Sequence, residues 1–339
     1  MRAVQVTGYG LTPENLQVNN VPKTQVKPGH LLVRVKAAAL NPVDYMMATG
    51  HFKFLPLPFT LGCDMAGVVE AVGPGVTGFR AGDEVCGLTG TWKDSGTLAE
   101  YCLIPQELAI RKPENLSFEE AATLGDGLIT ALVGIFKAHN LRLPSKGVAS
   151  SLLPETQSCL VWGASGSVGS YAVQLAKAAG FVVIGVCSPH NFGSVRQLGA
   201  AHVVDRAASD AVEQIKRYSE GKLRLAVDAV GSKETTEKCC ASLPGDTPGV
   251  TYSTVLPAVA PIPTPIHYYE IFVPKDLEDS LAYLGEATKE LSNLLAAGLL
   301  KPNIPEKISS SLDATSVLKG LQALEKKAVS GKKLVVVGD

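Results

Sequence analysis

The chain has no excess of charge of either sign, and it has no apolar run long enough to cross a membrane. Its 339 residues carry 31 Lys and Arg against 32 Asp and Glu, a net charge of −1. A nucleic-acid-binding protein usually shows a basic excess, so we expect neither nucleic acid nor a membrane as a partner. The N-terminus, Met1–Val6, reads as a strand and not as a signal peptide.

Cysteines are few and scattered, with one adjacent pair at Cys239–Cys240. Their number, seven, is odd, and the sequence lacks the short-spaced set of four that would hold a structural zinc. This usage is typical of a reduced intracellular protein, so we expect a cytoplasmic location. Hydrophobic residues make up 46% and charged residues 19%. The length and composition together predict a globular chain of about two domains.

The segment after Ser158 is the most informative part of the chain. A short apolar run, Cys159–Trp162, precedes glycines at three-residue spacing, and an apolar-striped helix follows and stops at Gly180. Phe181–Cys187 is a continuous β-branched run, as expected for a buried parallel strand. The order predicts a nucleotide-binding unit whose turn holds pyrophosphate at a helix N-terminus. The residues expected to line the phosphates are Gly163, Ser165, Gly166, Ser167, Val168 and Gly169.

The second strand of this unit lacks a carboxylate at its end. NAD-binding chains place Asp or Glu there to hold the ribose 2′-hydroxyl, whereas here a polar loop, Ser188–Phe192, follows. Hydroxyl, amide and imidazole groups can donate hydrogen bonds to a 2′-phosphate, which a carboxylate would repel. We therefore expect NADPH as the cofactor, with its 2′-phosphate held by Ser188, His190, Asn191 and Arg206.

A second glycine triplet, Gly73–Gly78, also matches the dinucleotide pattern but is expected to be a turn. The residues after it, Phe79–Asp83, have turn chemistry and no helical stripe. Without a helix N-terminus such a triplet has no dipole to hold a phosphate. The segment is therefore predicted to be a hairpin or loop turn in a β domain.

Two domains are predicted from the order of elements, and the fold class is α/β. Residues 1–126 carry short β-like runs broken by Pro and Gly, which indicates a partly open β barrel or roll. Residues 127–276 alternate strands with helices, the pattern of a doubly wound parallel sheet. Residues 277–339 are expected to complete the first domain through a closing strand. Further predicted elements are the strands Val203–Val204, Leu225–Ala229, Val250–Val255, Tyr269–Val273 and Gly331–Val337, and the helix Leu277–Ala297.

Several short motifs spread over the chain belong together. They are Asn41–Asp44, Leu61–Val69, Gly82–Val85, Gly96–Tyr101 and the Gly163–Gly169 turn. With these motifs almost the whole chain resembles the medium-chain dehydrogenase/reductase superfamily, and most of all its zinc-independent quinone and enoyl reductases. Cys187–Phe192 with Leu198–Ala200 further resembles the fungal trans-acting enoyl reductases that serve polyketide synthases. The resemblance implies a GroES-like β domain interrupted by a Rossmann domain that binds NADP.

The resemblance also bears on metal binding. Alcohol dehydrogenases of this superfamily hold a catalytic zinc with the help of a His–Glu pair, and the equivalent pair here is Cys63–Asp64. We therefore expect no metal. Without a Lewis acid, the chemistry favours hydride addition to the β carbon of a C=C bond conjugated to a carbonyl. The enolate oxygen then needs donors, and the α carbon takes a proton.

The resemblance implies roles for further residues. Asn41 corresponds to an Asn beside the nicotinamide and its ribose, Tyr45 has a phenol that can donate, and Thr130 corresponds to a hydroxyl near the nicotinamide. These three are the predicted catalytic residues. Leu256 and Lys333 are expected at the nicotinamide edge of the cofactor site.

Three functions stay open at this point. The first is an NADPH-dependent enoyl or enone reductase whose substrate is a small-molecule or carrier-bound α,β-unsaturated carbonyl, with a polyketide synthase as the implied partner. The second is an NADPH quinone oxidoreductase, which uses the same hydride and the same metal-free site. The third is an NADPH-binding protein without turnover. Met46 stands where the fungal enzymes often carry Lys, and Phe52 where many reductases carry Tyr. Both departures add weight to the third function, while the enoyl or enone reductase remains the leading hypothesis.

Overall fold

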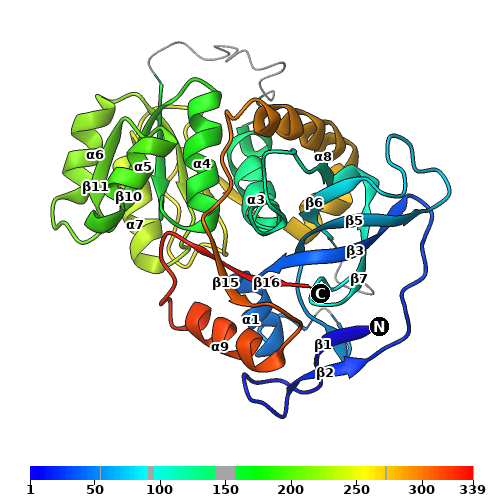
Figure 1. Cartoon of the computed structure of the whole chain (residues 1–339). Helices are drawn as coiled ribbons and strands as arrows, with labels where there is room; N and C mark the ends of the chain where they lie inside the picture. The colour runs from blue at the N-terminus through cyan, green and yellow to red at the C-terminus, as the bar shows by residue number, and fades with distance from the viewer. Residues whose placement is uncertain (54, 91–94, 140, 142–156, 272, 339) are drawn as a thin grey trace. The chain divides into compact units, whose positions relative to one another are not determined.

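The structure is a computed structural model that describes residues 1–53, 55–90, 95–139, 141, 157–271 and 273–338. The chain forms two compact units (Figure 1). The first consists of Met1–Asp126, Leu277–Ala296 and Pro302–Asp339, and the second of Gly127–Asp276 and Ala297–Lys301. Among the described residues no helix has the length and apolar character that a membrane crossing needs.

The second unit is built on a parallel sheet whose strands are mostly buried apolar runs. Its order is β11-β10-β9-β12-β13-β14, and all its strand pairs are parallel. The strand order reverses at β9, so the turn that follows β9 opens at the switch point where α/β sheets bind ligands. The strands are β9 Ser158–Trp162, β10 Val182–Cys187, β11 His202–Asp205, β12 Leu223–Asp228, β13 Thr251–Thr254 and β14 His267–Glu270.

Helices cover both faces of this sheet. Helices α4 and α5 pack together, as do α6 and α7, and right-handed crossovers put the two pairs on opposite faces. Gly180, with φ +95, follows the last turn of α4, as the sequence indicates. The helices are α3 Asp126–Ile135, η2 Lys137–His139, α4 Ser167–Ala178, η3 Pro189–Asn191, α5 Phe192–Leu198, α6 Ala211–Ser219 and α7 Lys233–Ser242.

Three predictions for this half of the chain are wrong in detail. The polar loop after β10 is helical, because η3 runs directly into α5. The sixth strand begins at His267, whose N–H donates to the Val250 carbonyl beside β13, so pairing and not hydropathy sets its start. Residues 297–301 cluster with the second unit, where the main chain of Lys301 exchanges two hydrogen bonds with the Gln174 amide, 2.8 and 3.2 Å long.

The first unit contains a mostly antiparallel seven-stranded sheet and a small three-stranded one. The larger sheet has the order β15-β16-β3-β5-β6-β8 with β7 also on β3, and the smaller one is β2-β1-β4. Strand β16 pairs antiparallel with β3, so the closing strand returns to the N-terminal part of the chain. The strands are β1 Arg2–Val6, β2 Leu16–Asn20, β3 His30–Ala39, β4 Phe59–Thr60, β5 Asp64–Val72, β6 Glu84–Leu88, β7 Tyr101–Pro105, β8 Ala109–Arg111, β15 Pro305–Ser309 and β16 Lys333–Val337.

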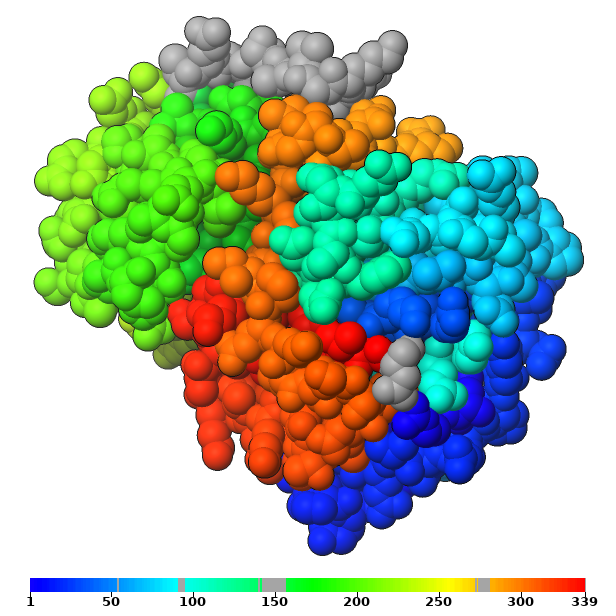
Figure 2. All heavy atoms as spheres, in the orientation of Figure 1, coloured from blue at the N-terminus to red at the C-terminus, as the bar shows by residue number. Residues whose placement is uncertain are grey.

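The Gly73–Gly78 triplet lies in the hairpin between β5 and β6, as predicted, because these strands pair antiparallel and Gly75 and Gly78 have positive φ. Ser117 caps the short helix α2, Phe118–Ala121, since its hydroxyl accepts from the Glu120 N–H. Strand β15 and helix α9, which packs on α1, were not foreseen (orange to red in Figure 2). The helices are α1 Pro42–Ala48, η1 Gln106–Leu108, α2 Phe118–Ala121, α8 Val273–Ala296 and α9 Ala314–Glu325.

Candidate functional site

The turn between β9 and α4 is closed by glycines. Gly163 has φ +78, and its N–H and that of Ala164 both donate to the Val186 carbonyl at 3.0 Å. A Cβ on Gly169 would lie 2.1 Å from the Gly163 carbonyl oxygen, so only glycine lets α4 pack this close to the turn. Helix α4 begins just after Gly166, and its N-terminus carries the partial positive charge that suits a phosphate.

The segment after β10 is tied to this turn by a side-chain hydrogen bond. Asn191 is buried, and its Nδ2 donates to the Ser165 Oγ at 3.0 Å. Ser188 is half-buried and His190 is exposed on the same short segment. Arg206 is exposed at the end of β11, and its N–H donates to the Cys187 carbonyl at 3.0 Å. The four residues predicted for a 2′-phosphate therefore gather at the carboxyl ends of β10 and β11.

Leu256 follows β13 at the same end of the sheet and packs against the segment after β12. A Cβ on Gly231 would lie 2.8 Å from the Leu256 Cβ, and one on Gly163 would lie 2.9 Å from the Val230 Cγ2. Asp228 fixes the backbone of the segment after β12, because its Oδ1 accepts from the N–H groups of Val230 and Gly231 at 2.9 and 3.0 Å. Asp228 was not assigned a role from the sequence. The sequence pattern that could have pointed to Asp228 is a carboxylate at the end of a buried strand, followed closely by a glycine.

Thr130 belongs to α3 and is almost completely buried. One turn earlier on the same helix, a Cβ on Gly127 would lie 2.3 Å from the Ser167 Oγ, so this side of α3 approaches the start of α4. Residues three apart share one side of a helix. Thr130 thus lies on the side of α3 that faces the glycine turn.

A second group of residues lies buried in the first unit, around the side chain of Asn41. The Lys333 ammonium donates to the Asn41 Oδ1 and lies 3.2 Å from the Asp64 Oδ2. The Asn41 Nδ2 donates to the Asp64 Oδ2 at 2.8 Å and to the Cys63 Sγ at 3.3 Å. Exposure is 1% for Asn41, 0% for Asp64 and 3% for Lys333. Two predicted residues from opposite ends of the chain therefore meet at a buried ion pair.

Two carboxylates of this cluster were not assigned a role from the sequence. The Asp64 Oδ1 accepts from the Asp126 N–H at 2.6 Å, so Asp64 also holds the last residue of the first unit. The Asp44 Oδ2 accepts from the Asn41 N–H at 2.7 Å and caps α1. Burial and the nearby Asp64 raise the pKa of Asp44 to about 8, so Asp44 is mostly protonated at neutral pH. The sequence pattern that could have pointed to Asp44 and Asp64 is a carboxylate within an otherwise apolar motif.

Tyr45 follows Asp44 on α1 but has different surroundings. Its side chain is half-buried, and burial together with the charge of Glu325 at the end of α9 raises the pKa of its phenol. Glu325 is not part of the Asn41 cluster, so the phenol and the Asp44 carboxyl lie in different environments. At neutral pH Tyr45 keeps its proton and can act as a hydrogen-bond donor.

The residues at the position of the superfamily's zinc pair do not fit a metal ion. The Cys63 Sγ accepts a hydrogen bond from the Asn41 Nδ2 at 3.3 Å, so it already has a partner inside the cluster. The Asp64 carboxylate is already paired with the Lys333 ammonium. Within the described part of the chain, no group of three His, Cys, Asp or Glu side chains has the geometry of a metal site.

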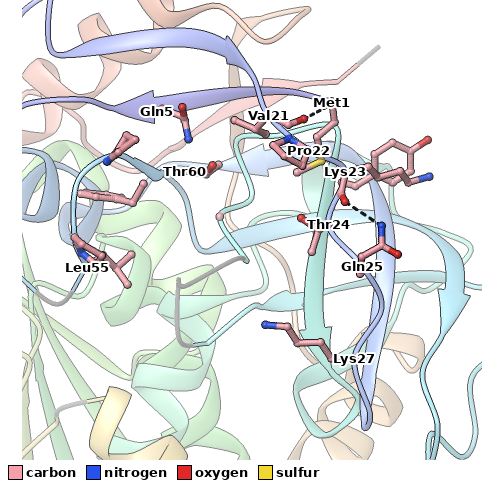
Figure 3. A pocket seen from close by; sticks show the side chains of 15 residues that line it. Met1, Gln5, Val21, Pro22, Lys23, Thr24, Gln25, Lys27, Leu55 and Thr60 are labelled. Atoms are coloured by element: carbon pink, nitrogen blue, oxygen red, sulfur yellow. Dashed lines mark hydrogen bonds between the residues drawn. The ribbon is translucent and has the colours of Figure 1, made fainter.

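The first unit also has an open groove of about 570 Å³, which contains none of the predicted site residues (Figure 3). Val21, Pro22 and Leu55 supply apolar walls, and Lys23 lies 3.8 Å from the centre of the Tyr101 ring. Its lining mixes apolar side chains with polar ones. The candidate site therefore consists of the glycine turn with its neighbours and the Asn41 cluster, each within its own unit.

Comparison with known proteins identifies the family of this chain. Residues 27–114 match the family model "Alcohol dehydrogenase GroES-like domain" and residues 167–247 match "Zinc-binding dehydrogenase". The trans-enoyl reductase ccsC of Aspergillus clavatus is 33% identical over 94% of this chain and 92% of its own length. The chain belongs to the medium-chain dehydrogenase/reductase superfamily.

Other members of the superfamily are also similar to this chain. The trans-enoyl reductase resD of Aspergillus sclerotiorum is 38% identical over 73% of this chain and 72% of its own length. A quinone oxidoreductase structure from Pseudomonas syringae is 25% identical, covers 99% of each chain and has a TM-score of 0.79. These members support the expected α/β fold and an oxidoreductase with a nicotinamide cofactor.

Proposed function

We propose that the protein is an NADPH-dependent reductase of C=C bonds conjugated to a carbonyl, acting without a metal. The observation that carries this proposal is the glycine turn at the switch point, combined with a segment after β10, Ser188–Phe192, that has polar side chains and no carboxylate. The full-length similarity to trans-enoyl reductases supports the substrate class. A bound NADPH supplies the hydride, and the protein supplies binding, orientation and hydrogen bonds.

The second unit provides the groups for the nucleotide. The first-turn N–H groups of α4 face the pyrophosphate, and the Gly169 contact lets the helix come close enough. Ser188 and His190 donate to the 2′-phosphate, Asn191 holds this segment through its bonds to the Ser165 Oγ and the His190 Nε2, and Arg206 adds positive charge beside them. Leu256 and the buried Thr130 belong to the nicotinamide end of this site.

The first unit provides the groups for the reacting carbonyl. Both N–H groups of the Asn41 amide are used by Asp64 and Cys63, so Asn41 is not the donor to the enolate oxygen. Tyr45 is a protonated phenol on the same helix and is our candidate for that donor. The α carbon takes its proton from Tyr45 or from water.

Steady-state NADPH oxidation with enoyl thioesters, enals and quinones tests the proposal. Turnover of the enoyl or enone substrates above that of quinones supports it, whereas turnover of quinones alone assigns the protein to quinone reduction, which the Pseudomonas syringae neighbour favours. NADPH binding without any turnover would leave a binding protein. Exhaustive chelation is expected to leave turnover unchanged, and an activity that requires added zinc would contradict the metal-free mechanism.

The partner is proposed from the same relatives. Trans-enoyl reductases at 31 to 38% identity suggest that this enzyme acts on an acyl chain tethered to the carrier protein of a polyketide synthase. Comparing kcat/KM on carrier-bound and free enoyl substrates decides between a tethered and a free substrate. A preference for free substrate would remove the synthase from the proposal and leave the reductase in place.

A further inference from the structure

The carboxamide of Asn41 lies between a group that can only donate and a group that can only accept hydrogen bonds. Lys333 approaches its Oδ1, and the Asp64 Oδ2 lies 2.8 Å from its Nδ2. An ammonium has no acceptor and an ionised carboxylate has no donor. The two ends of the amide therefore cannot exchange places, because the flipped amide would set N–H against the ammonium and C=O against the carboxylate.

The number of hydrogen bonds that the Asn41 amide can still form follows from the partners it already has. The second N–H of the Asn41 Nδ2 points to the Cys63 Sγ at 3.3 Å, so both of its hydrogens are used inside the cluster. The Oδ1 has two lone pairs, and Lys333 uses one of them. In the hydrogen bonds of the described residues, the Asn41 side chain therefore keeps one lone pair on Oδ1 and no N–H.

Asp64 holds this arrangement with both of its oxygens. Its Oδ2 takes the Asn41 amide and the Lys333 ammonium, and its Oδ1 takes the Asp126 N–H at 2.6 Å. A Cβ on Gly125 would lie 2.1 Å from that Oδ1, so the segment before Asp126 is packed directly on the carboxylate. An Asn at position 64 has one acceptor oxygen and cannot serve both sides.

We propose that Lys333 and Asp64 are positioning residues that lock the Asn41 amide in one orientation, so that Asn41 accepts a single hydrogen bond from the nicotinamide riboside half of the cofactor and donates none. The donor is a ribose hydroxyl or the carboxamide NH₂ of the nicotinamide. This role rests on the proposed function, since it requires that a nicotinamide nucleotide binds. It also changes the role of Lys333, which acts through Asn41 and makes no contact of its own with the nicotinamide.

Three variants and a matched control test the lock. Asp64→Asn and Lys333→Met each break it, and Asp64→Asn with Lys333→Met breaks it while leaving no unpaired buried charge. Lys112→Met is the control, because Lys112 is also a nearly buried lysine of the first unit, 2.8 Å from the Glu84 Oε2 and outside the cluster. NADPH affinity, kcat/KM and thermal stability are measured for each.

Both single variants are expected to lose NADPH affinity and kcat/KM by about ten- to a hundredfold, the range for a lost hydrogen bond to a charged group. The double variant should regain thermal stability, because its buried pair is neutral, but should not regain affinity or kcat/KM. The control should keep both within about twofold. If the double variant regains activity together with stability, the pair only balances charge and the proposal is overturned. Wild-type affinity in Asp64→Asn overturns it too.

The side-chain amide signal of Asn41 in a nuclear magnetic resonance spectrum gives a readout that needs no turnover. Its two hydrogens should exchange slowly in the wild type and much faster in Lys333→Met and Asp64→Asn. Fast exchange in the wild type overturns the lock, even if the enzyme is active. A wild type with a protected amide but no turnover of any substrate would instead refute the proposed function and leave the lock standing.

Discussion

At the scale of single residues, Asp44 has an unusual environment for a carboxyl group. Its side chain is fully buried, one oxygen caps α1, and the other has no hydrogen-bond partner among the described residues. Its pKa is raised from 3.8 to about 8, first by burial. The folded state therefore binds this proton more tightly than the unfolded state does. The contribution of Asp44 to stability is greatest at low pH and is lost as the pH rises towards about 8.

Asp44→Asn should remove that pH dependence. The difference in unfolding free energy between variant and wild type is expected to shift in favour of the variant as the pH rises from about 4 to about 8. Urea unfolding over this pH range measures the difference. Asp313→Asn is the contrasting control, because side-chain and backbone hydrogen bonds from Ser316 lower the pKa of Asp313. The stabilising contribution of the Asp313 carboxylate in the wild type is lost only as the pH falls. A pH-independent difference for Asp44→Asn would contradict the raised pKa.

A second single residue, Ser188, is expected to determine the preference for NADPH over NADH. Ser188→Asp places a carboxylate at the end of β10, where it repels a 2′-phosphate and can accept from a 2′-hydroxyl. The ratio of kcat/KM for NADPH over NADH should fall by about a hundredfold, with most of the loss on the NADPH side. Ser188→Asn, which has the same shape without the charge, is the control. An unchanged ratio in Ser188→Asp would remove the argument for NADPH.

At the scale of elements, the glycines of the β9–α4 turn have separate roles that two substitutions distinguish. A Cβ at position 169 would meet the Gly163 carbonyl oxygen at 2.1 Å, whereas one at position 166 would meet it at 3.3 Å. Gly169→Ala must push α4 away from the turn, so we expect a loss of about 1–3 kcal/mol in stability together with weaker nucleotide binding. Gly166→Ala should keep the stability and weaken nucleotide binding alone, because its backbone faces the phosphates.

Thermal unfolding without nucleotide and NADPH titration separate these two outcomes. Gly193→Ala in α5 serves as the control, since a Cβ there meets nothing within 4 Å and alanine favours a helix. It should be neutral or slightly stabilising. Equal stability of Gly169→Ala and the wild type would mean that the close contact does not limit the packing of α4.

Element by element, the sequence predicts the second unit better than the first. Strands β9 and β10 are continuous apolar runs, and the stripe of α4 with Gly180 after it marks a helix directly. The segment Pro189–Asn191 was expected to be a loop because its residues are polar, but the Asn191–Ser165 hydrogen bond holds it as a helical turn. Strand β15 is short and partly exposed, so its local pattern carries little signal.

The two parts of the candidate site also differ in how well the sequence predicts them. The glycine turn is a local pattern and is visible in seven residues of sequence, Gly163–Gly169. Lys333 is different, because its partner Asn41 stands 292 residues away along the chain. Pairing over such a separation has no local signature. The same reason explains why Asp64 was read only as a missing zinc ligand.

For the whole molecule, the closing strand β16 joins the two ends of the chain within the first unit. It lies between β15 and β3 in the sheet order, and it carries Lys333, the partner of the buried Asp64. Ending the chain after Ser330 would therefore expose the edges of two strands and leave a buried carboxylate without its ammonium. The sheet of the second unit uses only strands between Ser158 and Glu270 and loses none of them.

We expect this truncation to unfold the first unit and to leave the second folded. Hydrogen exchange followed by mass spectrometry should show lost protection in β3 and β5 and retained protection in β9 and β10. Full-length Lys333→Met separates the two causes, because it removes the ammonium and keeps the strand. If that variant keeps β3 and β5 protected while the truncation does not, the pairing of β16 with β3 holds the first unit together. Loss of protection in both units after truncation would mean that the second unit depends on the first for its stability.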